Sequence, residues 1–416
     1  MLSAILFIFY FILLLFALIA LMKAKKIDIS PTTTAFIYVY KVLFGCIYGY
    51  IFLKFYRGDD TWMYHRESLL QYQKLIHHPI DYLKDFLPYS QSQTFNYYIQ
   101  DLEYWSITKL LAVFNIFSRG NYYINVLFFD FLAIIGLLLI YKLLYVFYLN
   151  KKKLLILVLF FLPVTTFWLS GIRTEALLLL SMSVILYYTY KWFTQRRKTV
   201  YFIYIIIGLI GCFILRAQSL LIFIPAFFCL ILCWKTANKA IVYFSSVYII
   251  CVVLFFASML ISSENNLSIP IIKRQQEFFK LHGNTSFKLD SLQPSINSFI
   301  KILPQAFSNT FLRPFVWEAK GALQIVSALN IIFFWVLLLM ILFFHEKKWK
   351  QILNNPLLLL LIFYGISQVI LIGYVVPFPG AIVRYKAIPE LFLFLIITII
   401  FDFEHFRFSI MKSFGR

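Results

Sequence analysis

The sequence predicts an all-α protein, a polytopic transmembrane helical bundle with about 11 membrane-spanning helices. Of its 416 residues, 62% are hydrophobic and only 13% are charged, whereas roughly 25% of the residues of a soluble protein are charged. Long apolar runs alternate with short segments that carry Lys and Arg. A chain so poor in charge cannot cover a water-exposed surface. We expect a single transmembrane domain over residues 1–416.

The apolar runs give the expected helices in order. Residues 1–22 carry no charge and are followed by Lys23, Lys25 and Lys26. A signal peptide has its positive charge before the apolar core, so this run reads as an uncleaved helix with its N-terminus outside. The later runs predict helices at about 34–55, 122–149, 154–169, 175–193, 200–215, 217–234, 240–261, 322–344, 356–376 and 387–401.

The distribution of basic residues predicts the orientation of the chain. The six proposed inner loops hold 17 Lys and Arg against four acids, and cytoplasmic loops carry such an excess of positive charge. We therefore expect a multi-pass protein of the inner (plasma) membrane with its C-terminus in the cytoplasm. The formal net charge of +20 reads as topology, and no nucleic-acid partner is expected.

Two long polar sections, about 57–121 and 262–320, face the outside in this topology. The first mixes acids with aromatic and aliphatic residues, which predicts short amphipathic helices along the membrane surface. Pro79 and Pro88 are expected to divide it into pieces.

The sequence contains no motif for nucleotide or zinc chemistry. It has no Walker-type loop, no dinucleotide-binding glycine pattern and no H-E-x-x-H. The five cysteines lie inside apolar runs, where they read as small apolar residues. His77 and His78 could join the nearby acids around a metal, but adjacent side chains diverge, which favours plain surface polarity. No metal ligand is assigned, no cofactor is certain, and participation of a divalent cation stays open.

Charged residues at the outer membrane edge are the candidates for chemistry. Asp59 and Asp60 form an acidic pair, and a carboxylate can remove the proton of an attacking hydroxyl. Arginine binds phosphate oxygens through a planar, permanently charged fork. The candidates for binding substrate or phosphate, each predicted near the outer end of a helix, are Arg173, Glu175, Arg216, Arg313, Arg384 and Lys386.

Several of these residues have a structural alternative. Asp59 and Asp60 could cap a loop and keep it in water. The stretch Ser170 to Glu175 reads equally as a helix start, with Thr174 as N-cap and Glu175 favourable near the helix N-terminus. Phe315 and Trp317 are more readily explained as membrane-interface anchors than as sugar-stacking groups.

The stretch Gly58-Asp59-Asp60 resembles the acidic motif of the GT-C superfamily of membrane glycosyltransferases. Those enzymes have many membrane helices, and their first outer loop carries an acidic motif and surface helices. The resemblance covers the architecture of roughly the first 200 residues. It implies transfer of a sugar from a polyprenyl-phosphate donor to a glycan, lipid or protein acceptor on the outer face, with Asp59 or Asp60 as acid/base.

Two other classes stay open. An O-antigen polymerase or ligase has a similar helix count and uses outer arginines, with 262–320 as its late outer loop. A non-enzymatic transporter of lipid-linked glycans, or a membrane assembly subunit, would bind membrane lipids without chemistry. Transport predicts charges near mid-membrane, and Asp130 and Lys142 are the main candidates.

Overall fold

The structure is a computed structural model that describes residues 1–56, 59–84, 95–195, 198–234, 239–261, 266–281, 283 and 285–414. The chain is 84% helical, and its described part contains no strand. The predicted all-α class is therefore confirmed. Gly58 and Pro88, which carry parts of the sequence-based predictions, lie outside the described residues.

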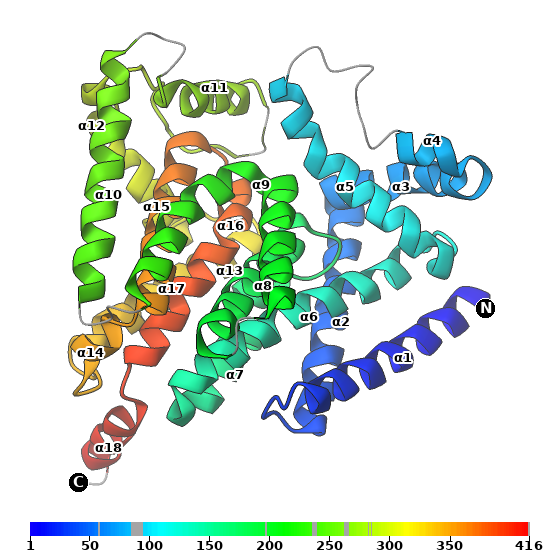
Figure 1. The fold of residues 1–416 in the computed structure, drawn as a ribbon, viewed down its shortest axis with the longest axis horizontal. Helices are drawn as coiled ribbons and strands as arrows, with labels where there is room; N and C mark the ends of the chain where they lie inside the picture. Colours follow the sequence, from blue (N-terminus) through cyan, green and yellow to red (C-terminus); the bar gives the residue numbers. More distant parts are fainter. Residues whose placement is uncertain are drawn as a thin grey trace. The chain divides into compact units, whose positions relative to one another are not determined.

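The chain divides into two compact units, Met1–Leu220 and Leu221–Arg416, so the expectation of a single domain stays a prediction. The first unit contains α1 (Leu2–Ala24), α2 (Pro31–Phe55), α3 (Asp59–His77), α4 (Pro79–Lys84), α5 (Phe95–Ser118), α6 (Tyr122–Phe147), η1 (Leu149–Lys151), α7 (Lys152–Phe161), η2 (Val164–Trp168) and α8 (Thr174–Thr194) (Figure 1). Helix α9 (Thr199–Cys233) runs across the boundary.

The second unit has a similar all-helical composition. It contains α10 (Ala240–Ala257), η4 (Ser258–Leu260), α11 (Ser268–Phe279), α12 (Ile296–Phe307), η6 (Ser308–Leu312), η7 (Val316–Glu318), α13 (Ala322–Ile341), α14 (Trp349–Leu353), α15 (Pro356–Val375), α16 (Pro379–Tyr385), α17 (Ala387–Ile400) and α18 (Phe403–Phe414).

Eight helices of the described residues are long and apolar enough to cross a membrane. They are α1, α2, α6, α8, α9, α10 with η4, α13 and α15. The count of about 11 is not confirmed. Helix α17, with 14 residues, is a shorter apolar helix, and α9 covers two of the predicted helices. The backbone of α9 leaves helical geometry at Arg216, whose φ is −163° and ψ is 80°.

The predicted helix at 154–169 is interrupted. Helix α7 ends at Phe161, and Pro163 follows two residues later. A proline disfavours helical geometry in the residue before it, and Leu162 is extended, with φ −63° and ψ 142°. The chain then forms the five-residue π-helix η2 before α8 begins at Thr174. This irregular segment leads directly into Arg173 and Glu175 at the start of α8.

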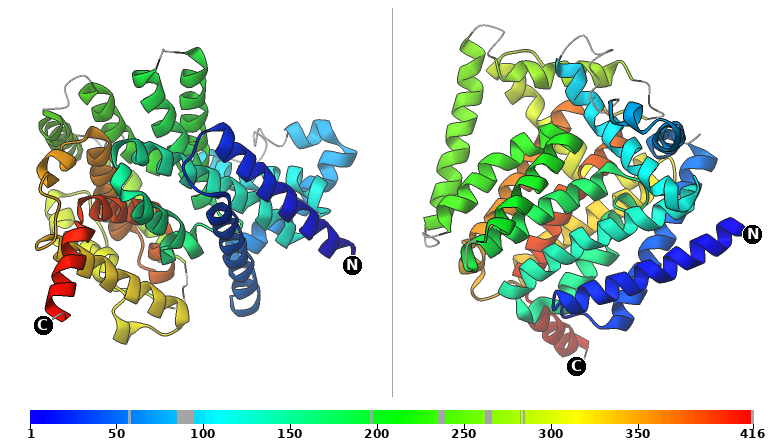
Figure 2. Two further views of the ribbon diagram at one scale, coloured as in Figure 1. Left: turned by 90° about the horizontal axis from the view of Figure 1, so that it is seen from below. Right: turned by 45° about the vertical axis from the view of Figure 1, so that its right-hand side comes forward.

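Helix α6 forms the centre of the first unit and lies beside α8, α2 and α1 (Figures 1 and 2). Its close approach to α2 depends on two glycines four residues apart, a spacing that lets membrane helices touch. A Cβ added at Gly45 would lie 2.2 Å from a carboxylate oxygen of Asp130, and one at Gly49 would lie 2.3 Å from the ring of Tyr122. These glycines therefore fix how near the two helices lie.

The first long polar section is helical in its described residues, as predicted. Helix α3 lies beside α5, and α4 begins at Pro79, where the break was expected. The buried side chains of α3 recur three or four residues apart, at Thr61, Tyr64, His65, Ser68 and Gln71. This spacing is that of one helix face. The helix is therefore amphipathic, while its position at a membrane surface stays a prediction.

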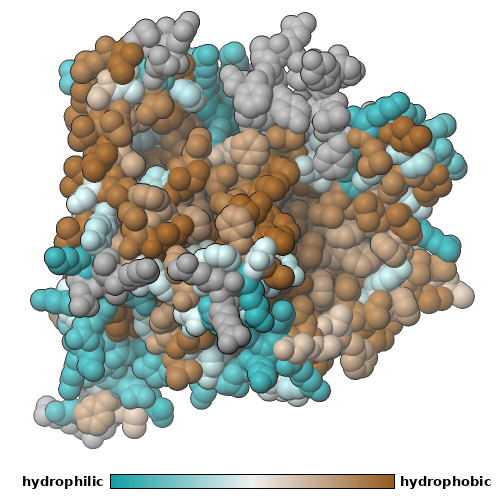
Figure 3. All heavy atoms as spheres, in the orientation of Figure 1, coloured by the Kyte–Doolittle hydropathy of each residue, from teal (hydrophilic) through white to brown (hydrophobic). Residues whose placement is uncertain are grey.

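In the second unit, α15 lies beside α17, α12 and α10. Hydrophobic residues cover the visible side of α10 (Figure 3). Among the residues of this helix, Ile249, Val253 and Leu254 are exposed. Such a surface suits contact with lipid. The five cysteines of the chain are free thiols and lie in α2, α9 and α10, at Cys46, Cys212, Cys229, Cys233 and Cys251. The topology of the termini and the plasma membrane as location stay predictions.

Candidate functional site

Arg173 is the residue around which the candidate site of the first unit is built. Its side chain is only 2% exposed, and its guanidinium carbon lies 4.7 Å from the ring centre of Tyr48 and 5.4 Å from that of Phe52. Both aromatic residues belong to α2. A desolvated guanidinium is attracted to aromatic faces, so the rings of α2 hold Arg173 in place. The rings do not neutralise its positive charge.

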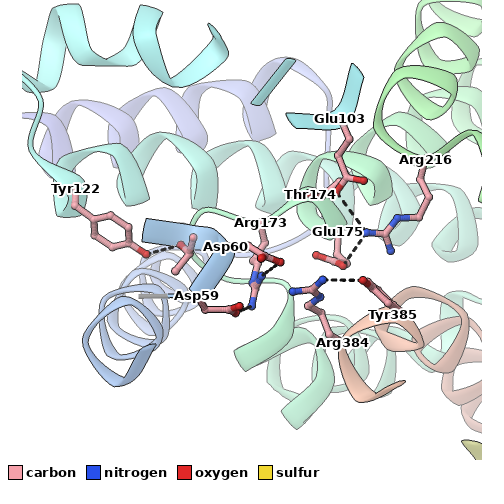
Figure 4. A network of polar contacts seen from close by, with 11 residues as sticks. Asp59, Asp60, Glu103, Tyr122, Arg173, Thr174, Glu175, Arg216, Arg384 and Tyr385 are labelled. Carbon is pink, nitrogen blue, oxygen red and sulfur yellow. Dashed lines mark hydrogen bonds and ion pairs between the residues drawn. The ribbon is translucent and has the colours of Figure 1, made fainter. Parts of the chain in front are cut away.

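The acidic pair supplies the opposite charge. Arg173 Nη2 donates to Asp59 Oδ2 at 3.0 Å, and Nη1 lies 3.8 Å from Asp60 Oδ2 (Figure 4). Asp59 and Asp60 form the first turn of α3, where negative charge is favourable. Asp59 has φ 33°, a left-handed value that Asp tolerates better than most residues. The structure thus brings Asp59, Asp60 and Arg173 into direct contact, while their location on the outer side stays a prediction.

Arg216 forms a second cluster beside the first. Its Nη2 lies 3.2 Å from Glu175 Oε1 and 3.5 Å from Glu103 Oε1, and Thr174 donates its hydroxyl to Glu103 Oε1 at 2.7 Å (Figure 4). The break in α9 at Arg216 brings this residue to the N-terminus of α8. Because Arg173, Thr174 and Glu175 are consecutive, the two clusters meet at the start of α8.

The start of α8 differs in detail from the sequence-based interpretation. The N-cap residue is Arg173, which is extended at φ −142° and ψ 138°, and Thr174 is the first helical residue. The hydroxyl of Thr174 binds Glu103 instead of capping the helix. Glu175 lies in the first turn, as expected, and its buried side chain is 3% exposed. Its ion pair with Arg216 offsets the cost of that burial.

The exposure of the charged groups divides them into two kinds. The side chains of Asp59 and Asp60 are 30% and 35% exposed, while that of Arg173 is buried. The carboxylates are thus accessible to a substrate and the arginine supports them from within. The cluster therefore combines two partly exposed carboxylates with a buried guanidinium.

Arg313 lies in the second unit and is held by its own neighbours. Its Nε and Nη2 donate to the two carboxylate oxygens of Glu318 at 3.0 and 2.6 Å, and its guanidinium carbon lies 4.0 Å from the ring centre of Phe287. The Arg313 guanidinium holds the pKa of the Glu318 carboxyl below its usual value. This bidentate pair joins Arg313 to Glu318 in the loop before α13.

Arg384 and Lys386 lie at the end of α16 and before α17. Arg384 Nη2 donates to the hydroxyl of Tyr385 at 2.9 Å (Figure 4). Lys386 is buried, donates to the carbonyl of Thr310 at 3.0 Å and lies 3.7 Å from Glu390 Oε1. Asn330 donates to the same Glu390 oxygen at 2.9 Å. Lys386 therefore belongs to a buried ion pair, lining a small pocket with Phe311 and Phe334.

Sequence reasoning missed three buried charges, Lys41, Lys109 and Glu390. Lys41 and Glu390 each interrupt an apolar run, and a lone ionisable residue in such a run is itself a signal for a functional or structural role. Asp130 was singled out and is fully buried. Lys142, the other mid-membrane candidate, is bonded to the backbone carbonyl of Lys25 at the end of α1. No group of three or more potential metal ligands occurs among the residues that the structure describes.

Comparison of the chain with models of protein families, with curated proteins and with solved structures finds no match. Nothing in these comparisons bears on the resemblance to the GT-C superfamily.

Proposed function

We propose that the protein is a membrane glycosyltransferase of the GT-C type, acting on a polyprenyl-phosphate-linked sugar at the outer face of the membrane. The observation that supports this most is the contact of Asp59 and Asp60 with Arg173. The acidic motif lies at a helix start, is partly exposed, and is joined to a buried cation from a distant part of the chain. A partly exposed carboxylate that a buried cation holds in one orientation can accept a proton from a substrate hydroxyl.

The proposed reaction divides its steps among these residues. The carboxylate of Asp59 or Asp60 removes the proton of the acceptor hydroxyl, whose oxygen then bonds to the anomeric carbon of the donor sugar. The bond from that carbon to the phosphate oxygen breaks, and polyprenyl phosphate leaves with the electron pair. Arg173 orients the acids, and Arg216 is the candidate of this unit for the phosphate. Participation of a divalent cation stays open.

The test is donor consumption by purified protein in proteoliposomes. A panel of synthetic polyprenyl-phosphate hexoses and pentoses is supplied together with oligosaccharide and glycolipid acceptors that carry free hydroxyls, and release of polyprenyl phosphate is measured for Asp59→Asn and Asp60→Asn. We expect at least one of them to abolish release, because an amide cannot accept the proton. Asp81→Asn is the matched control, since Asp81 is 62% exposed on α4 and its ion pair is with Lys84 of the same helix. Full activity in both variants, or an equal loss in the control, contradicts the proposal.

The nearest rival, an O-antigen polymerase or ligase, is distinguished by the arginines of the second unit. Loss of activity with Arg313→Gln and Arg384→Gln, at unchanged activity of Asp59→Asn, supports the rival. Arg313 is paired with Glu318 as Arg216 is with Glu175, so activity measurements on the variants, and not the ion pairs, separate the two classes.

A further inference from the structure

Both halves of the candidate site are attached to the same two membrane helices, α2 and α6. On the acidic side, the hydroxyls of Thr61 and Tyr122 lie 2.7 Å apart. Trp62 donates its indole N–H to the carbonyl of Gly49 at 2.8 Å and stacks on Tyr122, with ring centres 3.9 Å apart and an interplanar angle of 10°. The start of α3, with Asp59 and Asp60, is thereby fixed to α2 and α6.

The basic half is attached by two buried charges. Lys41 of α2 donates its ammonium to the carbonyl of Thr165 at 2.6 Å. Asp130 of α6 accepts the backbone N–H of Gly171 at 2.8 Å. Lys41 is 2% exposed and Asp130 is 0% exposed. Between them these residues hold both ends of the segment from η2 to the turn before Arg173.

The segment needs such partners because it is neither a regular helix nor a strand. Backbone N–H and C=O groups at membrane depth must find internal partners, and irregular backbone occurs there only where the protein satisfies it. A carboxylate and an ammonium supply stronger hydrogen bonds than neutral groups. Gly171 has φ 76°, a conformation that favours glycine, and its N–H points to Asp130 in that conformation.

The surroundings of Asp130 leave it little freedom. A Cβ added at Gly45 would lie 2.2 Å from Asp130 Oδ2, and one added at Gly171 would lie 3.4 Å from the carbonyl oxygen of Gly45. The α2 backbone at Gly45 therefore packs closely against both the Asp130 carboxylate and the turn at Gly171. Two residues further along the chain, Arg173 meets Tyr48 and Phe52 of the same α2.

We propose that Lys41 and Asp130 are positioning residues for Arg173. They hold the backbone of residues 165–171 at a fixed depth in the first unit, so that the guanidinium meets Asp59 and Asp60. The catalytic consequence rests on the proposed glycosyltransferase function, whereas the placement of the segment does not. Burying Lys41 and Asp130 within two membrane helices is costly. In return, these two residues fix the positions of the site residues at the ends of those helices.

The placement is tested by hydrogen–deuterium exchange of peptides that cover residues 164–175, in detergent-purified full-length protein. Asp130→Ala removes the acceptor of the Gly171 N–H, and Lys41→Met removes the donor to Thr165. We expect faster exchange of these peptides in both variants. Asp130→Asn, whose side-chain oxygen still accepts a hydrogen bond, is the matched control and should restore protection. Should Asp130→Ala fail to fold, Lys41→Met carries the same test from the other end of the segment.

The consequence for catalysis is tested by a double-mutant comparison in the donor-consumption assay. A misplacement of about 1 Å can cost about 100-fold in rate, so we expect kcat to fall by about that factor in Asp130→Ala with KM nearly unchanged. The loss should not deepen when Asp130→Ala is combined with Arg173→Met, because both act through the same guanidinium. A general loss of folding would add to the effect of Arg173→Met instead.

The outcomes separate the two proposals. Unchanged exchange in Asp130→Ala and Lys41→Met, or exchange in Asp130→Asn as fast as in Asp130→Ala, overturns the positioning role. Altered exchange together with full donor consumption by Asp59→Asn and Asp60→Asn leaves the positioning role intact and removes the proposed function.

Discussion

The Arg173 guanidinium and the Asp59 carboxylate lie 3.0 Å apart, although 114 residues separate them in the chain. Three elements meet to make this contact: the first turn of α3, the turn before α8, and the aromatic face of α2. The arginine is buried and the acid is partly exposed. The contact therefore joins a group that a substrate can reach to one that it cannot.

Replacement of Arg173 tests whether its shape matters as well as its charge. Arg173→Lys keeps the charge but loses the fork that reaches both Asp59 and Asp60. We expect donor consumption to fall by about 100-fold in Arg173→Lys and in Arg173→Met, with the larger fall in melting temperature for Arg173→Met. Lys84→Met, at an exposed position of α4, is the control. Near-normal activity of Arg173→Lys would show that the fork is dispensable.

The pair of Arg216 with Glu175 predicts a coupled effect on stability. Arg216→Gln leaves the buried Glu175 carboxylate without this cation, and breaking a buried pair costs about 3 kcal/mol or more. Glu175→Gln in the same chain should recover most of that loss, because the charge that needs compensation is gone. Thermal unfolding followed by fluorescence-detected gel filtration measures both. Equal and additive losses from the two substitutions contradict the pairing.

His65 predicts a dependence of stability on pH. Burial lowers the pKa of this imidazole from 6.5 to about 4, and the charge of Arg66 adds to the shift. Below pH 6.5 the unfolded chain binds a proton that the folded chain does not bind until about pH 4, so stability falls as the pH drops through this window. The effect is at most about 3 kcal/mol. Melting temperatures of wild type and His65→Phe from pH 7 to pH 4.5 should diverge in slope, with the wild type the steeper.

The buried pair of Lys386 with Glu390 predicts a different pattern in the second unit. Glu390→Leu leaves a buried ammonium beside an apolar side chain and should cost about 3–5 kcal/mol. The double variant Lys386→Met with Glu390→Leu replaces both charges by apolar groups and should be close to wild type in melting temperature. A double variant as unstable as Glu390→Leu alone would mean that Lys386 does not depend on Glu390.

The sequence allowed prediction of most of the apolar helices, because membrane spans are set by length and composition alone. It did not allow prediction of the break at Pro163 followed by a π-helix, or of α9 as one run with a kink. The predicted helices at 200–215 and 217–234 leave Arg216 between them. In the structure the two helices form one run, α9, whose backbone departs from helical geometry at Arg216. A single arginine between two apolar runs indicates an interruption of the helix, but it does not indicate the backbone geometry of that interruption.

The candidate residues themselves were predictable, whereas their pairing was not. Asp59, Asp60, Arg173, Glu175 and Arg216 stand out as charges beside apolar runs. Nothing in their spacing tells that Arg173 contacts the aspartates while Arg216 contacts glutamates, because those contacts depend on which helices are neighbours. The hydrogen bonds of Asp130 and Lys41 reach backbone groups 41 and 124 residues away in the chain, which no local pattern encodes.

The placement of the cysteines has a practical consequence for mapping the chain. All five thiols lie inside three helices that are candidates for crossing the membrane, and we expect a membrane-impermeant maleimide, which needs water, not to react with them. The natural chain thus offers a nearly silent background for site-directed labelling. A single new cysteine in the segment after α1, or in α18, would report directly which side of the bilayer each end faces.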